Sequence, residues 1–112
     1  MGYQHRYLDG SLLDLPVGKV VCIGRNYPDH IRELNSAVPE TPILFMKPDT
    51  ALLGLDESIR LLKGRGECHH EVELAVLVGQ PLRNADAAMA HQAVAGYGIA
   101  LDLTLRDVQN EL

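Results

Sequence analysis

The most constraining feature of this chain is a run of alternating residues, HHEVELAVLVG, at positions 69–79. Because successive side chains of a β-strand point to opposite faces, residues two apart share a face. We therefore predict a strand here. One face of it is apolar, and we expect that face to lie in the core: Val72, Leu74, Val76 and Val78. The other face carries Glu71 and Glu73 side by side.

Two adjacent carboxylates on one strand face repel each other, and burial makes their ionised forms costly unless something compensates the charge. Water on an exposed face would do this, and so would a Lys or Arg from a neighbouring strand. A bound cation is the third possibility. Spacing alone leaves all three open for Glu71 and Glu73.

The rest of the chain predicts short elements separated by turns. Pro28 suits the first position of a helix, Asp86 can cap another, and Thr104 opens the sequence TLRD, which matches a capping box. We expect strands at 20–23, 43–46, 59–62 and 96–101, and helices at 28–35, at 86–94 and from 104 onward.

Composition excludes several classes of function. A net charge of −5, a pI of about 5.4 and the lack of any basic run argue against a nucleic-acid partner. No apolar stretch approaches the roughly 18 residues that a membrane helix needs, so we expect no membrane partner. Only two cysteines are present, far apart in sequence, and reduced thiols in a cytoplasmic protein are the default expectation.

The predicted first helix places His30 and Glu33 three residues apart, on one face. A carboxylate beside an imidazole can orient it and raise its basicity, which is what a general base needs. The same spacing also occurs as an ordinary pair on a helix surface.

A second polar set follows the apolar strand at 96–101. Asp102, Arg106 and Gln109 would form one stripe if the last helix extends back that far, and a solvated helix face is the simpler interpretation. Asp102 could alternatively join Glu71 and Glu73 as a third carboxylate. Ligation by oxygen alone suits Mg²⁺, Mn²⁺ or Ca²⁺ rather than zinc.

Four segments taken together resemble the fumarylacetoacetate hydrolase family, in the family's order: KVVCIGRNYPDHIREL, PILFMKPDTAL, HHEVELAVLVG and AVAGYGIALDLTLRDVQ. The likeness runs from about Lys19 to Gln109 and is greatest to the short branch of acylpyruvate hydrolases, oxaloacetate decarboxylases and isomerases. The resemblance implies an α+β fold with a mixed, strongly bent β-sheet and short helices.

The resemblance also implies roles for individual residues. Mg²⁺ or Mn²⁺ would be bound by Glu71, Glu73 and Asp102. His30 and Glu33 would form the dyad that activates water. Five further residues would face or support the substrate: Arg25, Asn26, Lys47, Arg106 and Gln109.

By the same resemblance we expect a metal-dependent hydrolase that cleaves a C–C bond in a small 2-oxo acid such as an acylpyruvate. Oxaloacetate decarboxylation, isomerisation of an unsaturated dicarboxylate and an inactive fragment are the alternatives. Family members are about twice as long, so we expect residues 1–112 to form a single, truncated domain of this type. We also expect the protein to form a homodimer.

Overall fold

The computed structural model describes residues 2–24 and 42–111. The chain divides into two compact units, Met1–Ser58 and Ile59–Leu112, and each is considered by itself. The expected helix at 28–35 lies outside the described residues, and so do Arg25, Asn26, His30 and Glu33.

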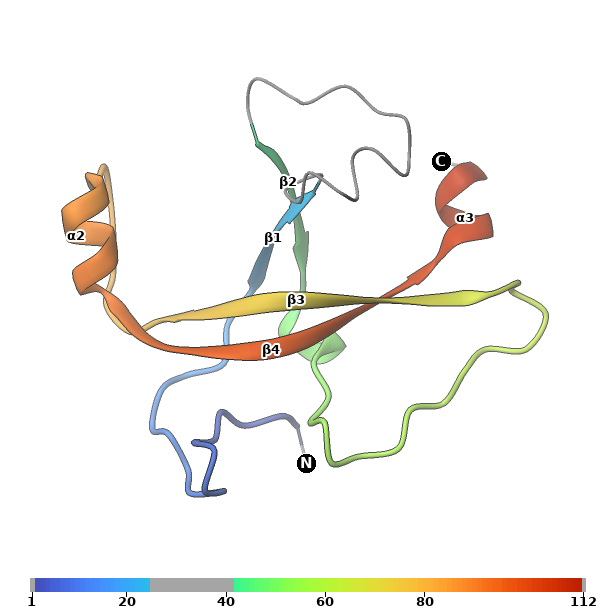
Figure 1. Ribbon diagram of the computed structural model, residues 1–112, viewed down its shortest axis with the longest axis horizontal. Helices are drawn as coiled ribbons and strands as arrows, with labels where there is room; N and C mark the ends of the chain where they lie inside the picture. The colour runs from blue at the N-terminus through green and yellow to red at the C-terminus, as the bar shows by residue number, and fades with distance from the viewer. Residues whose placement is uncertain (1, 25–41, 112) are drawn as a thin grey trace. The chain divides into compact units, whose positions relative to one another are not determined.

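The described residues of the first unit form one strand pair, drawn in blue and green in Figure 1. Strand β1 (Val20–Gly24) pairs antiparallel with β2 (Ile43–Lys47), with Val20 opposite Lys47. A single turn of 3-10 helix, η1 (Asp49–Ala51), follows directly after Pro48. Both strands were predicted from the sequence, and each proves one residue longer.

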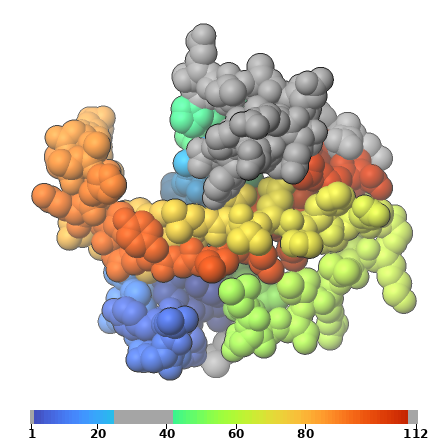
Figure 2. Space-filling view, in the orientation of Figure 1, coloured from blue at the N-terminus to red at the C-terminus, as the bar shows by residue number. Residues whose placement is uncertain are grey.

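The second unit is built on a long antiparallel hairpin of β3 (Cys68–Val78) and β4 (Val94–Leu105). The two strands run side by side along their length, β3 in yellow and β4 in orange (Figures 1 and 2). Pairing extends from Cys68 opposite Leu105 to Val78 opposite Val94, with one irregularity at Leu77/Val78. The strand predicted from the alternating run is confirmed.

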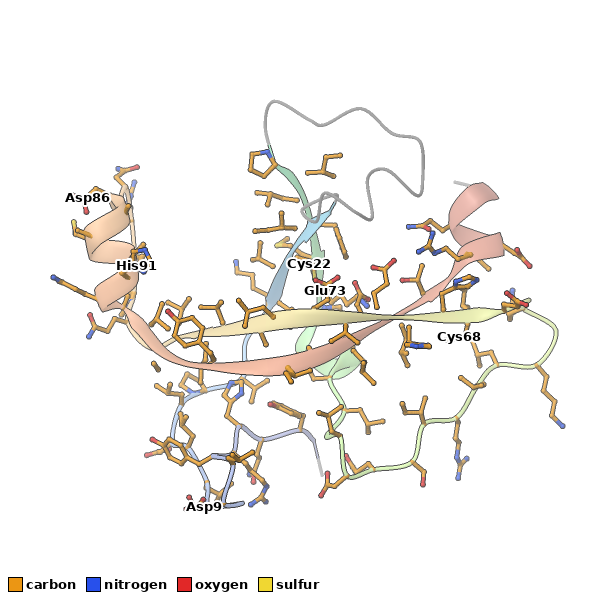
Figure 3. All side chains as sticks on the ribbon, in the orientation of Figure 1. Asp9, Cys22, Cys68, Glu73, Asp86 and His91 are labelled. Carbon is orange, nitrogen blue, oxygen red and sulfur yellow. The ribbon has the colours of Figure 1, made fainter. Side chains whose placement is uncertain are left out.

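Two short helices accompany the hairpin. Helix α2 (Ala87–Gln92) connects the strands, and α3 (Arg106–Glu111) follows β4. Asp86 caps α2 as predicted, because its carboxylate accepts a hydrogen bond from the Met89 amide at 2.8 Å (Figure 3). The helix ends at Gln92, two residues earlier than expected, and its C-cap Ala93 is almost fully buried.

Two predictions near the hairpin were wrong. Thr104 does not cap a helix, since it lies within β4 opposite His69, and α3 begins only at Arg106. Cross-strand pairing outweighs the local capping signal there, so the strand expected at 96–101 runs on to Leu105. Residues 59–62 form no strand in the described structure, where they lack a pairing partner.

The two faces of β3 are covered differently from our expectation. The apolar face predicted as core is the exposed one, with Leu74 64 % exposed and its β4 partner Ile99 69 % exposed. The face that carries Glu71 and Glu73 is half-buried. Alternation shows which residues share a face, but it does not show which face is covered.

Both strand pairs in the described part of the chain are antiparallel, and they are accompanied by short helices, so the chain has the expected α+β class. Among the described residues, no helix has the length and apolar character needed to cross a membrane.

Candidate metal centre

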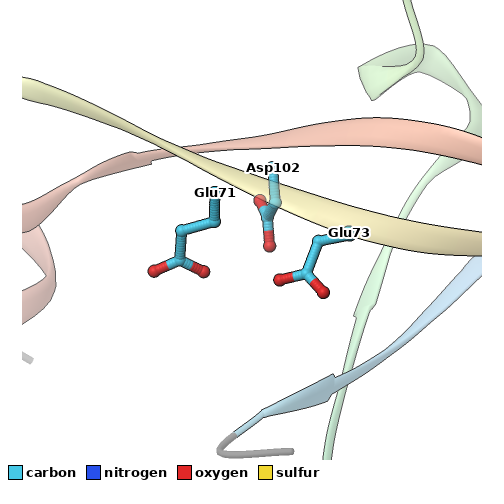
Figure 4. A group of neighbouring side chains, drawn as sticks. All are labelled: Glu71, Glu73 and Asp102. Atoms are coloured by element: carbon cyan, nitrogen blue, oxygen red, sulfur yellow. The ribbon is translucent and has the colours of Figure 1, made fainter. Parts of the chain in front are cut away.

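The register of the hairpin brings three carboxylates together. Glu71 lies directly opposite Asp102, and Glu73 lies two residues further along β3, on the same face. One oxygen from each of Glu71, Glu73 and Asp102 lies within 4.8 Å of the others. All three side chains are half-buried, and Figure 4 shows them extending to the same side of the hairpin.

An arginine neutralises part of this charge. Nη2 of Arg106, the first residue of α3, donates a hydrogen bond to Oε1 of Glu71 at 2.7 Å. The Arg106 side chain is 23 % exposed and that of Glu71 28 %, so this ion pair is partly shielded from water. This bond offsets charge on Glu71, and a divalent cation bound at the cluster would offset more of the negative charge that the three carboxylates carry.

The donor set fits a hard divalent cation. All three candidate ligands offer carboxylate oxygen, the donor that Mg²⁺, Mn²⁺ and Ca²⁺ prefer. Two oxygens on opposite sides of Mg²⁺ lie about 4.2 Å apart, twice the usual metal–oxygen distance, and about 5 Å apart around Ca²⁺. The observed spread of up to 4.8 Å is therefore close to a binding geometry, within a small side-chain adjustment.

Arg106 has a second notable feature. Its Nε atom is buried and has no hydrogen-bond partner among the described residues. A buried donor without a partner is costly, and the cost falls when an acceptor reaches it. An anionic oxygen placed beside the carboxylate cluster would serve that purpose.

Two other predicted substrate residues lie in the described part of the chain. Gln109 is exposed on α3, and Lys47 is the half-buried last residue of β2 in the first unit. The helical stripe of Asp102, Arg106 and Gln109 required the last helix to extend back to Asp102, and it does not, because Asp102 belongs to β4 and only the other two lie on a helix.

The pairing of Arg106 with Glu71 was not foreseen from the sequence. Local spacing could not reveal it, because the two residues are 35 positions apart. The pairing could have been inferred only from the strand register. With Glu71 opposite Asp102, Arg106 at the start of α3 follows four residues after the partner of Glu71.

Comparisons with known proteins identify the family of this chain. Residues 19–112 match the family model described as fumarylacetoacetate (FAA) hydrolase C-terminal. The oxaloacetate tautomerase YcgM of Escherichia coli K12 is 56% identical over 110 residues, which cover 98% of this chain and 50% of that protein.

Two solved structures show the same similarity. A protein of Yersinia pestis assigned to the fumarylacetoacetate hydrolase family superposes with a TM-score of 0.93 and 51% identity, covering 97% of this chain and 50% of that one. A protein of Burkholderia cenocepacia assigned as a fumarylpyruvate hydrolase superposes with a TM-score of 0.77 and 36% identity, covering 99% of this chain and 48% of that one. This chain thus spans about half the length of these relatives. It belongs to the fumarylacetoacetate hydrolase family.

Proposed function

We propose that this chain supplies the metal-binding part of an Mg²⁺- or Mn²⁺-dependent enzyme acting on a small 2-oxo acid. The observation that carries the proposal is the cluster of Glu71, Glu73 and Asp102 on one half-buried hairpin face. Among the reactions known in relatives, keto–enol conversion of oxaloacetate is the one we favour, because the E. coli relative named for it is 56% identical.

Keto–enol conversion moves one proton between carbon C3 and the 2-oxo oxygen of the substrate, with no other bond broken. Glu71, Glu73 and Asp102 would hold the cation, which when bound would supply Lewis acidity at the 2-oxo oxygen and an anchor for the neighbouring carboxylate. His30, oriented by Glu33, would take the proton from C3 and return it to the 2-oxo oxygen.

The substrate class follows from the charges near the site. A 2-oxo dicarboxylate brings anionic oxygens, and the unpartnered Nε of Arg106 is a donor suited to one of them. By the family resemblance, further contacts to the substrate are proposed for Lys47, Gln109, Arg25 and Asn26.

Hydrolytic C–C cleavage of an acylpyruvate is the second candidate, supported by the 36% identity to the Burkholderia protein. It would use the same cluster, but His30 would take its proton from water attacking the distal carbonyl. Decarboxylation of oxaloacetate requires no such water. The three reactions therefore differ in their products, although they would share one site.

Product analysis separates these candidates. The chain would be incubated with Mg²⁺ or Mn²⁺ and either oxaloacetate or an acylpyruvate, while enol absorbance, CO₂ and pyruvate are followed. We expect faster loss of enol absorbance from oxaloacetate without extra CO₂, relative to metal without protein. Asp102→Asn should lose this effect, and Glu67→Gln, a change at an exposed residue outside the cluster, should keep it.

The full-length E. coli relative would be assayed beside this chain. Activity in the relative and none in a folded sample of this chain would show that the chain alone does not suffice, and the proposal would fail for it. Pyruvate release from the acylpyruvate, without enol conversion of oxaloacetate, would favour the hydrolase instead.

A further inference from the structure

The contact between Arg106 and Glu71 involves only one of the two carboxylate oxygens. Nη2 of Arg106 lies 2.7 Å from Oε1 of Glu71, and no bond to Oε2 is found among the described residues. Charge-assisted bonds of this length between partly buried groups hold a side chain in one rotamer. One oxygen of Glu71 is thus engaged by Arg106, whereas no bond to the other is described.

We propose that Arg106 is a positioning residue that keeps Glu71 a one-oxygen ligand and thereby favours small cations over Ca²⁺. The inference rests on the metal site of the proposed function. Mg²⁺ takes six oxygens in a strict octahedron and usually binds carboxylates through one oxygen each. Ca²⁺ takes six to eight oxygens at longer distances and often binds a carboxylate through both. An arginine on Oε1 would remove that second oxygen from Ca²⁺.

The guanidinium also contributes positive charge beside the cluster. Its removal would make the cluster more negative and would strengthen attraction to every divalent cation alike. A change in overall affinity therefore reports charge, whereas a change in the ratio of Ca²⁺ to Mg²⁺ affinity reports how many oxygens Glu71 offers.

The surroundings of Arg106 support a fixed position. It is the first residue of α3, immediately after Leu105, which is paired with Cys68. Both ends of the ion pair are therefore anchored in the same hairpin. Its neighbour Asp107 lies against Gly66, where an added Cβ would overlap the Asp107 carboxylate. The loop before β3 thus contacts the first turn of α3.

Calorimetry with Mg²⁺, Mn²⁺ and Ca²⁺ tests the inference on the wild-type chain and three variants. Arg106→Met removes both the charge and the hydrogen bonds, and Arg106→Lys keeps the charge but not the planar, forked donor set. Lys63→Met removes one positive charge from an exposed loop position of the same unit. Circular dichroism would confirm that each variant is folded.

We expect the ratio of Ca²⁺ to Mg²⁺ affinity to rise about tenfold in Arg106→Met, the size of effect expected for a lost outer contact to a metal ligand. Arg106→Lys should restore part of the wild-type ratio, and Lys63→Met should leave it unchanged. An unchanged ratio in both Arg106 variants, with cation binding retained, would overturn this inference alone. Absence of cation binding in the folded wild-type chain would overturn the metal site and the inference together.

Discussion

Glu71 and Asp102 are direct cross-strand partners in the β3–β4 hairpin. Two like charges placed opposite each other destabilise a strand pair, and Glu73 adds a third on the same face. Arg106 relieves part of this repulsion through its bond to Glu71. A divalent cation bound at the cluster would reduce the repulsion further, and this effect can be measured as stability.

Removing one carboxylate should have opposite effects with and without metal. In Glu73→Gln we expect the metal-free chain to gain about 0.2–1 kcal/mol in free energy of unfolding, because repulsion falls. The stabilisation by Mg²⁺ or Mn²⁺, about 2.7 kcal/mol when the ion is at a hundred times its Kd, should disappear. Thermal melts with and without metal check both effects. Glu67→Gln serves as the control, and a full metal response in Glu73→Gln would refute its role as a ligand.

The proposed base should affect catalysis but not metal binding. His30→Ala is expected to lower the rate of oxaloacetate enol conversion by about 10²–10⁴-fold, the usual contribution of a general base. The calorimetric affinity for Mn²⁺ should stay within error of wild type, because His30 is not among the proposed ligands. His91→Ala, on the exposed side of α2, is the matched control. A His30→Ala chain with the wild-type rate would exclude His30 as the base.

The loop before β3 allows a paired test of close packing. Gly64 and Gly66 have nearly equal backbone angles, with φ of +76° and +77°, but only Gly66 lies against another residue, Asp107. Gly64→Ala should lose about 1–2 kcal/mol of unfolding free energy from backbone strain alone. Gly66→Ala should lose roughly 1 kcal/mol more, because the Asp107 carboxylate must move.

Urea unfolding of both variants measures the difference. Because Asp107 adjoins Arg106, Gly66→Ala should also raise the ratio of Ca²⁺ to Mg²⁺ affinity, whereas Gly64→Ala should not. Equal losses of stability in the two variants would mean that Asp107 swings aside without cost.

The exposed apolar face of the hairpin should be detectable with a hydrophobic dye. Tyr97, Ile99 and Leu101 lie opposite Val76, Leu74 and Val72, which creates a continuous apolar surface. Replacing Ile99 with Thr should reduce the fluorescence of bound anilinonaphthalene sulfonate. Leu8→Thr, at an exposed leucine in a turn, should change it little. Equal dye binding by wild type and Ile99→Thr would show that this face is not accessible in solution.

One pH effect is local to the first unit. The Ser11 hydroxyl donates a hydrogen bond to Asp9 at 2.6 Å, and the Ser11 amide donates another to the same oxygen, which together hold the pKa of Asp9 below its ordinary value. A lowered pKa contributes stability above the unfolded-state value, about 4, and that stability is lost as pH falls through the folded-state value. In Ser11→Ala, NMR titration should show the Asp9 pKa rising toward the ordinary value, and an unchanged pKa would refute the assignment.

Local patterns in the sequence were sufficient for much of the secondary structure. Period-two alternation predicted β3, and the Asp86 signal predicted the start of α2, because each depends on residues a few positions apart. Thr104 shows where this reasoning stops: a good local capping signal lost to pairing with His69. The strand expected at 59–62 also did not form, since a strand needs a partner that no local pattern guarantees.

The candidate site divides in the same way. Alternation alone placed Glu71 and Glu73 on one face, and the family resemblance added Asp102. The proximity of Asp102 to both glutamates depends on the register of two strands that are separated in sequence by a helix. The contact between Arg106 and Glu71, which lie 35 residues apart in the sequence, depends on that register too. Which face of β3 is covered was likewise a matter of long-range packing, because burial depends on what lies against a strand and not on its own alternation.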